Sequence, residues 1–299
     1  QISAGMAHIF GIEETFTNKV YIIIFITLLG LTSVSLGLNA GIKKLSQVNM
    51  IIAIGLLLLV FIFGPTVFIL NALVQNFGAY LNTILQSATW TEVYNTSSWQ
   101  NGWTLFYYTW WFSWAPFVSL FIARISYGRT IKEFIVGVLF VPSLIVFIWM
   151  GVFGNAAIYQ VINNTSDISQ IVASNMPVAL FTLYDVYPFA QPLSIISLVL
   201  IVTFFVTSSD SGALVASMLS SKDQSDIHDD SPMISRVTWA ILLGVVAAVL
   251  LYAGGLTALQ TSVVITGVPF AFIMVFACMN LLKDLKESGN TPPGHIDSN

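Results

Sequence analysis

Charged residues are scarce in this chain. Asp, Glu, Lys and Arg make up 8% of the 299 residues, whereas hydrophobic residues make up 56% and the mean hydropathy is +0.84. Soluble domains carry roughly 25% charged residues. The composition therefore excludes an ordinary soluble protein and indicates several membrane-spanning helices. The net charge of −4 belongs to the loops, and we expect no nucleic-acid partner.

Side chains for redox and metal chemistry are also few. The single cysteine, Cys278, excludes an internal disulfide and a cysteine metal cluster. The histidines, His8, His228 and His295, are scattered without ligand spacing. An integral-membrane enzyme needs a clustered acid, base or metal site, and the apolar runs hold one obvious carboxylate, Asp210. We expect no enzyme and no cofactor; a channel, the other alternative, would need a repeated pore loop or charged rings.

Long apolar runs are what the sequence has in abundance. Runs of about 20 residues predict seven complete spans after a partial helix from Gln1 to Ile12. The expected fold is all-α, a polytopic membrane helix bundle. Because Gln1 already lies in a helical pattern, we expect a fragment that lacks its N-terminal part. The predicted spans are 19–38, 49–73, 102–125, 133–155, 192–221, 236–256 and 261–282.

The basic residues predict the orientation. Apart from Lys19, every lysine and arginine falls on one face of the alternating topology, and the positive-inside rule makes that face cytoplasmic. We therefore expect a multi-pass protein of the plasma membrane with a cytoplasmic C-terminus.

Of the two long outer connections, 74–101 has apolar residues at helical spacing, which predicts an amphipathic helix in the outer interface. The other, 156–191, predicts a short capped helix.

Three tryptophans stand in the middle of the predicted span 102–125. Trp110, Trp111 and Trp114 lie seven, eight and eleven residues past Trp103, which is about 10 to 16 Å deeper in a helix. Interfacial anchors belong at headgroup depth, as Trp103 does. Spacings of three and four residues place these rings on one helix face, and aromatic faces receive quaternary ammonium groups by cation–π contact. Packing between helices is the alternative.

Polar residues interrupt the predicted span 192–221. Hydroxyls and freed carbonyls are the ligands that alkali cations find in broken transporter helices, and an intramembrane carboxylate is a functional candidate. The alternative for the hydroxyls is back-bonding to the preceding turn. For the carboxylate we favour a gate or structural salt bridge to Arg124 or Lys222 over direct ion binding. The run is Thr207, Ser208, Ser209, Asp210 and Ser211.

These segments resemble the betaine/choline/carnitine transporter (BCCT) family. Within 103–131 the match rests on Trp103-Thr104 with Phe106-Tyr107, Trp110-Trp111 with Trp114, Pro116-Phe117, FIARIS at 121–126 and GRTI at 128–131. It also rests on TFFVTS at 203–208 with Asp210-Ser211. It extends to Gly41-Ile42 with Leu45-Ser46 and Asn49, and to Gln1-Ile2 with Gly5. The matching segments are spread over nearly the whole chain, and the long tryptophan-to-arginine motif is highly specific.

The resemblance implies a secondary transporter of the inverted-repeat type, with two five-helix repeats around a midplane site. It implies import of a quaternary-ammonium compatible solute, glycine betaine first, with choline and carnitine as alternatives, by a homotrimer in the lipid bilayer. The chain would be the last eight of twelve spans, one transporter domain over 1–299. Its expected parts are 1–100 from the first repeat, 101–285 as the second repeat and 286–299 as a cytoplasmic tail.

The resemblance also implies substrate-binding residues. Trp111 resembles the tryptophan that this helix contributes to an aromatic box for the ammonium. Trp110 lies beside it, and Trp114 lies further along the inward path. Phe117 sits where the family can place an aromatic face near a second cation.

For the coupling ion, the resemblance implies half of a sodium site. The Phe204 carbonyl and the hydroxyls of Thr207 and Ser208 match that half, and the other half would come from a helix outside the chain. Ion-independent carnitine exchangers of the family carry an arginine and a methionine at positions that align with Asn49 and Val118. Neither replacement is present, which favours a cation-coupled symporter with sodium as the ion; proton-coupled choline import is the alternative.

Overall fold

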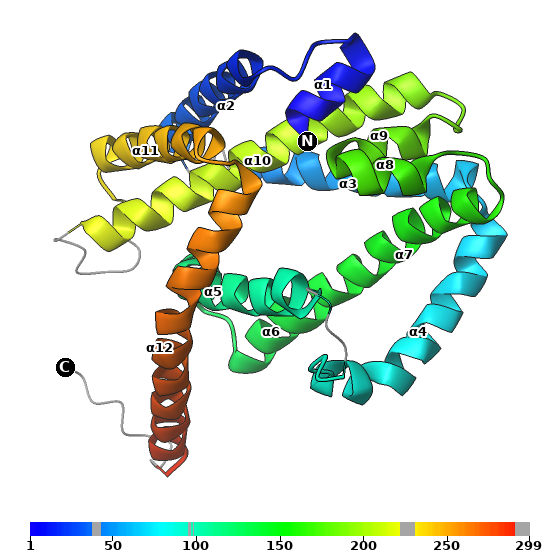
Figure 1. Cartoon of the computed structure of the whole chain (residues 1–299). Helices are drawn as coiled ribbons and strands as arrows, with labels where there is room; N and C mark the ends of the chain where they lie inside the picture. Colours follow the sequence, from blue (N-terminus) through cyan, green and yellow to red (C-terminus); the bar gives the residue numbers. More distant parts are fainter. Residues whose placement is uncertain (38–42, 95–96, 98, 222–230, 291–299) are drawn as a thin grey trace. The chain divides into compact units, whose positions relative to one another are not determined.

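The computed structural model describes residues 1–37, 43–94, 97, 99–221 and 231–290. Throughout these residues the regular structure is helical, without a strand, which confirms the all-α prediction (Figure 1). The helices form two compact units. The first comprises Gln1–Trp90 with Ser126–Ala248, and the second comprises Thr91–Ile125 with Val249–Asn299.

The first unit contains most of the helices. They are α1 (Ile2–Phe10), α2 (Phe16–Gly37), α3 (Lys43–Phe63), α4 (Thr66–Thr89), α6 (Ile131–Ile135), the π-helix η3 (Val136–Phe140), α7 (Val141–Ile162), α8 (Ile168–Asn175), the 3₁₀ turn η4 (Met176–Val178), α9 (Ala179–Tyr184), α10 (Ala190–Ser220) and most of α11 (Met233–Tyr252). The second unit contains the π-helix η2 (Gln100–Leu105), α5 (Phe106–Ile125) and α12 (Leu256–Asn290).

Seven helices of the described residues are long and apolar enough to cross a membrane, which confirms a polytopic membrane protein. They are α2, α3, α4, the continuous helix Ile131–Ile162, α10, α11 and α12. The set differs from the predicted one, because α5 forms the predicted helix 102–125 but falls outside the seven. Its tryptophans and tyrosines carry polar tips, which lowers their hydropathy although their rings are large.

The predicted span 49–73 is wrong, because the helix breaks at Gly64 and Pro65. Proline lacks the N–H that a helix interior needs and disfavours helical geometry in the residue before it. Pro65 becomes the N-cap of α4, and the Thr66 hydroxyl donates to the Phe61 carbonyl at 2.6 Å. The segment predicted as a separate amphipathic helix is indeed helical, but it is the second part of α4.

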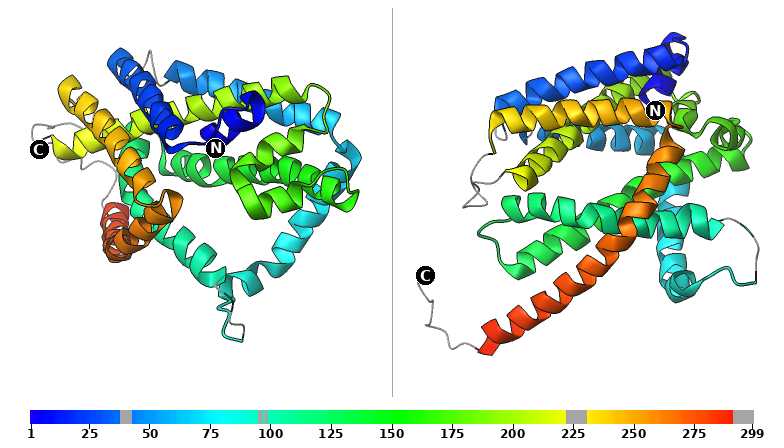
Figure 2. Two further views of the ribbon diagram at one scale, coloured as in Figure 1. Left: turned by 45° about the horizontal axis from the view of Figure 1, so that its top comes forward. Right: turned by 60° about the vertical axis from the view of Figure 1, so that its left-hand side comes forward.

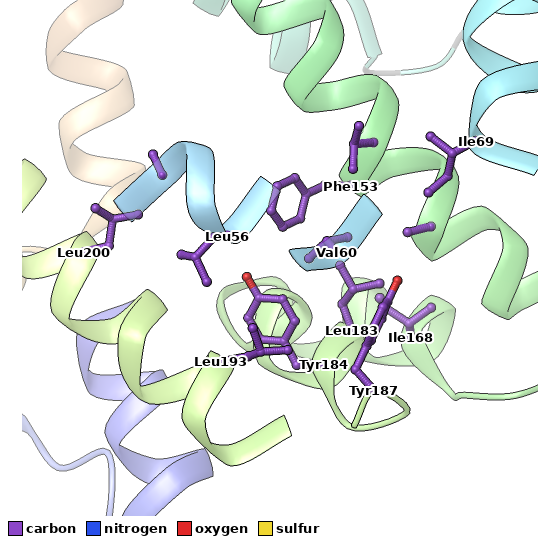
Figure 3. Packing of buried hydrophobic residues seen from close by; sticks show 13 residues of the cluster. Leu56, Val60, Ile69, Phe153, Ile168, Leu183, Tyr184, Tyr187, Leu193 and Leu200 are labelled. Carbon is purple, nitrogen blue, oxygen red and sulfur yellow. The ribbon is translucent and has the colours of Figure 1, made fainter. Parts of the chain in front are cut away.

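A core between α3, α7, α10 and the short helices α8 and α9 holds the first unit together (Figure 3). Val60 and Ile69 are fully buried there. Two polar pairs lie in this layer: the Tyr184 hydroxyl and the Ser197 hydroxyl are 2.9 Å apart, and the Gln160 amide donates to the Leu183 carbonyl at 2.9 Å. Burial raises the pKa of Tyr184 to about 12, so this hydroxyl keeps its proton. The core therefore anchors one end of α10.

The helix predicted within 156–191 is present as α8, but its cap differs from expectation. Asp167 occupies the N-cap without a side-chain hydrogen bond. The Ser166 hydroxyl instead accepts a hydrogen bond from the Ile168 N–H at 3.3 Å.

In the second unit, α5 and α12 approach closely through small residues. A Cβ on Gly267 would lie 2.8 Å from the Cβ of Thr109, so only glycine fits at this crossing. The Ser113 hydroxyl lies 3.3 Å from both the Val263 carbonyl and the Thr266 hydroxyl. Small residues allow helices to pack closely in a membrane, where burial of apolar surface provides little driving force for helix association. This α5–α12 contact, called the seam below, lies on one face of α5. The face that carries the tryptophans is not covered by α12.

Gly267→Ala tests the seam. The added methyl group must separate α5 from α12, and overpacking of this kind costs about 1–3 kcal/mol. We expect a lower free energy of unfolding in detergent than for the matched control Gly102→Ala, whose methyl group meets no atom within 4 Å. Equal unfolding free energies for the two variants would contradict the close approach.

Candidate functional site

Aromatic rings form a continuous row that begins at Trp103 of η2 and runs along one side of α5. Trp103 and Tyr107 stack with ring centroids 5.9 Å apart, and Tyr107 and Trp110 are 5.8 Å apart. Trp110 and Trp111 follow at 6.3 Å, and Trp111 meets Trp114 edge-to-face at 5.2 Å and 85°. Helical spacing of three and four residues brings these rings together. The structure thus joins the three tryptophans predicted to bind substrate.

The tryptophan faces remain accessible within the chain. Trp110, Trp111 and Trp114 are 43%, 55% and 42% exposed, whereas Thr109, which faces α12, is 4% exposed. The seam with α12 therefore leaves these rings free. Phe117 lies one turn beyond Trp114 on the same helix and is half-buried.

Glu92 positions the start of this helix, and the sequence reasoning missed it. Its backbone has a φ of 57°, in the left-handed region, and its side chain is 9% exposed. The carboxylate accepts hydrogen bonds from the Gln100 N–H at 3.0 Å and from the Ser97 hydroxyl. A carboxylate beside the free N–H groups of a helix start is favourable. An acidic residue shortly before an aromatic helix was the available signal.

The polar segment of α10 does not interrupt the helix, which is a correction to the sequence interpretation. The α-helix runs unbroken from Ala190 to Ser220. The hydroxyls of Thr207 and Ser208 both donate to the Phe204 carbonyl, each at 2.9 Å. This is the back-bonding geometry, and it keeps polar groups satisfied inside an apolar helix.

The same geometry brings the three predicted ion ligands together. The oxygens of Phe204, Thr207 and Ser208 lie within one helical turn, and each hydroxyl keeps lone pairs that its donated proton does not use. Hard oxygens of this kind are suited to an alkali cation. Thr207 is buried at 8% exposure, whereas Ser208 is exposed.

Asp210 is buried in the first unit at 1% exposure. Among the described residues, neither of its carboxylate oxygens has a hydrogen-bond partner. Arg124 lies in the last turn of α5, in the second unit. Lys222, the other predicted partner, lies outside the described residues. The salt bridge therefore stays a prediction.

The helices, the aromatic row and the polar segment together define a polytopic membrane protein with elements suited to a cationic solute and a small cation. A family model for BCCT, betaine/carnitine/choline family transporters, matches residues 1–290. The chain belongs to this family. The resemblance read from the tryptophan motif is thereby confirmed, and the family is one of transporters rather than enzymes.

Several curated relatives are similar along nearly the whole chain. The glycine betaine transporter of Acinetobacter baylyi is 41% identical over 287 residues, which is 96% of this chain and 43% of the relative. The glycine betaine/proline/choline/ectoine transporter of Vibrio parahaemolyticus is 39% identical, over 96% of this chain and 50% of the relative. The glycine betaine transporter OpuD of Bacillus subtilis is 37% identical, over 96% and 55%. The chain spans about half the length of the curated relatives it matches.

Proposed function

We propose that the protein takes part in the import of glycine betaine, by secondary active transport coupled to sodium. Choline and carnitine are the alternative substrates, because both share the quaternary ammonium head. The row of aromatic rings on the uncovered face of α5 carries the proposal. The similarity to the glycine betaine transporters of Acinetobacter baylyi and Bacillus subtilis supports glycine betaine as the first candidate.

The chemistry of the substrate explains the need for this row. A trimethylammonium group has no N–H to donate, so it is attracted to the negative faces of aromatic rings. Trp111 and Trp114 stand nearly perpendicular, at 85°, so they offer faces in two directions. Trp110 extends this surface, with its ring centroid 6.3 Å from that of Trp111, and Phe117 follows Trp114 by three residues on α5.

For the coupling ion, we assign Phe204, Thr207 and Ser208 as ligands on α10. Sodium would accept the lone pairs of the two hydroxyls and of the carbonyl to which they now donate. Neither the arginine nor the methionine of the ion-independent exchangers is present at Asn49 and Val118, which supports a bound cation. Because binding linkage is reciprocal, sodium and substrate would each strengthen the affinity for the other.

We further propose a multi-pass arrangement in the plasma membrane with a cytoplasmic C-terminus and a homotrimeric assembly. The distribution of basic residues supports the orientation, and family membership supports the assembly. Asp210 and Arg124 are the residues of the predicted gate or structural salt bridge.

Replacing Trp111 by leucine keeps apolar bulk but removes the aromatic face. A desolvated cation–π contact contributes about 2 kcal/mol, so we expect the dissociation constant of glycine betaine to rise about thirtyfold. The measurement is equilibrium binding of labelled substrate to the natural full-length polypeptide. Trp103→Leu, at the entry of the helix, is the matched control and should change the affinity little. Unchanged affinity in Trp111→Leu would refute its role in recognition.

Thr207→Val is nearly isosteric and removes one ligand oxygen. We expect the sodium concentration for half-maximal uptake to rise, and substrate affinity at fixed sodium to fall and recover when sodium is added. The measurement is uptake into proteoliposomes across a series of sodium concentrations. Uptake by the wild type that does not depend on sodium, or an unchanged sodium dependence in the variant, would favour proton coupling instead.

A further inference from the structure

A histidine connects the first helix to the turn that precedes α10. Nε2 of His8, on α1, lies 3.1 Å from Oδ1 of Asp185, although the two residues are 177 positions apart in the chain. Asp185 follows α9 and precedes α10, and both residues belong to the first unit. The pair therefore joins two segments that are distant in the sequence.

Two further contacts lie beside this pair. The imidazole of His8 stacks on the ring of Phe181 in α9, with centroids 6.0 Å apart and planes at 29°. Phe181 is fully buried against Gly5 of α1, where a Cβ would lie 2.9 Å from Cε2 of Phe181 and 3.1 Å from Cδ1 of Leu198. Helix α1 also packs against α10 and against η4, the turn between α8 and α9 (Figure 2). His8 thus lies next to a close contact between α1 and the segment before α10.

The pair is accessible to water, so pH can change its charge. The side chains of His8 and Asp185 are 27% and 50% exposed. A histidine side chain changes charge between about pH 5 and 8, whereas an aspartate in water stays ionised over that range. A hydrogen bond between a protonated imidazole and a carboxylate is stronger than one from a neutral imidazole, because both partners are then charged. The pair is therefore stronger in acid than in alkali.

Asp185 is the acidic residue within ion-pair distance of His8 in the described part of the chain. In the connection from α1 to α2, Glu13 is exposed, and Glu14 pairs with Lys19 of α2 at 3.4 Å. The side chains of η4, MPV in sequence, do not ionise. The charge of His8 therefore acts on Asp185.

The other ionisable groups on the neighbouring elements do not compete for this role. Burial raises the pKa of Tyr184 and of Tyr187 to about 12, so both hydroxyls stay neutral between about pH 5 and 8. On α10 the ionisable residue is Asp210, which lies about 30 Å along the helix from Ala190.

We propose that His8 and Asp185 form a pH-sensitive clasp that holds the entry of α10 on α1. In acid, protonated His8 keeps the α9–α10 turn on α1, and in alkali the turn opens more often. The turn leads directly into α10, so the clasp regulates how firmly the start of that helix is held. The proposed orientation places both segments outside, where the clasp responds to external pH. The inference does not depend on the proposed substrate or ion.

Hydrogen exchange measured by mass spectrometry tests the clasp in the natural full-length polypeptide. In detergent both faces meet the same pH, so the test does not depend on orientation. The amides that report are those of Asp185 and Tyr187, which donate to the Thr182 and Tyr184 carbonyls at 3.2 and 2.8 Å. Comparing wild type and variant at the same pH cancels the effect of pH on exchange itself.

The variant is His8→Gln, which can still donate to the carboxylate but cannot become charged. Exposed ion pairs change an equilibrium by a factor of roughly two to five. At about pH 5 we therefore expect the turn to exchange faster in the variant than in the wild type by that factor. At about pH 8 the two should exchange alike.

Lys19→Gln is the matched control, because it breaks an ion pair of similar exposure without a histidine. It should leave exchange in the turn unchanged at both pH values. Asp185→Asn, measured on the unaltered α1 peptide, should speed exchange only in acid, as His8→Gln does in the turn. Equal exchange in wild type and His8→Gln in acid would overturn the clasp. A difference of the same size at both pH values would also overturn it, because an ordinary hydrogen bond would explain that result.

Discussion

Polar groups inside an apolar helix bundle must find partners within the protein, because lipid offers none. On α10 this constraint is met locally: the hydroxyls of Thr207 and Ser208 donate to the Phe204 carbonyl. The helix stays unbroken, and the oxygens of Phe204, Thr207 and Ser208 lie within one turn. Asp210 and Ser217 are exceptions, since both are buried without a hydrogen-bond partner for the side chain among the described residues. Hydrogen-bonded hydroxyls and an unpartnered carboxylate thus lie within one turn of the same helix.

In the second unit, one face of α5 packs against α12 and another face carries the tryptophans. Small residues at Thr109 and Ser113 contact α12, and Gly267 permits the close crossing. The aromatic rings of Trp110, Trp111 and Trp114 lie outside this contact and remain exposed within the chain. Glu92 holds the entry of the helix from the segment before it.

Much of the helical architecture followed from the sequence, and its errors have physical causes. The span 49–73 was drawn from an apolar run, but Pro65 removes a backbone donor, and the helix restarts there as α4. The polar run in α10 was expected to interrupt the helix, but serine and threonine hydroxyls can satisfy the preceding turn. The tryptophan spacing correctly indicated one shared side of α5, because a regular helix dictates it. The signal for Glu92 was weaker, a single acidic residue before the aromatic helix, because its carboxylate acts across a loop on the Gln100 N–H.

The sequence by itself determined the class of the protein and its family. Apolar content and helical spacing are properties of neighbouring residues, and the tryptophan motif is continuous in the chain. Only the tertiary structure decided which face of α5 meets α12, and that Gly5 of α1 meets Phe181 of α9. These contacts join residues far apart in the chain, and they depend on how whole helices pack. A glycine in a sequence does not show which side chain will occupy the space it leaves.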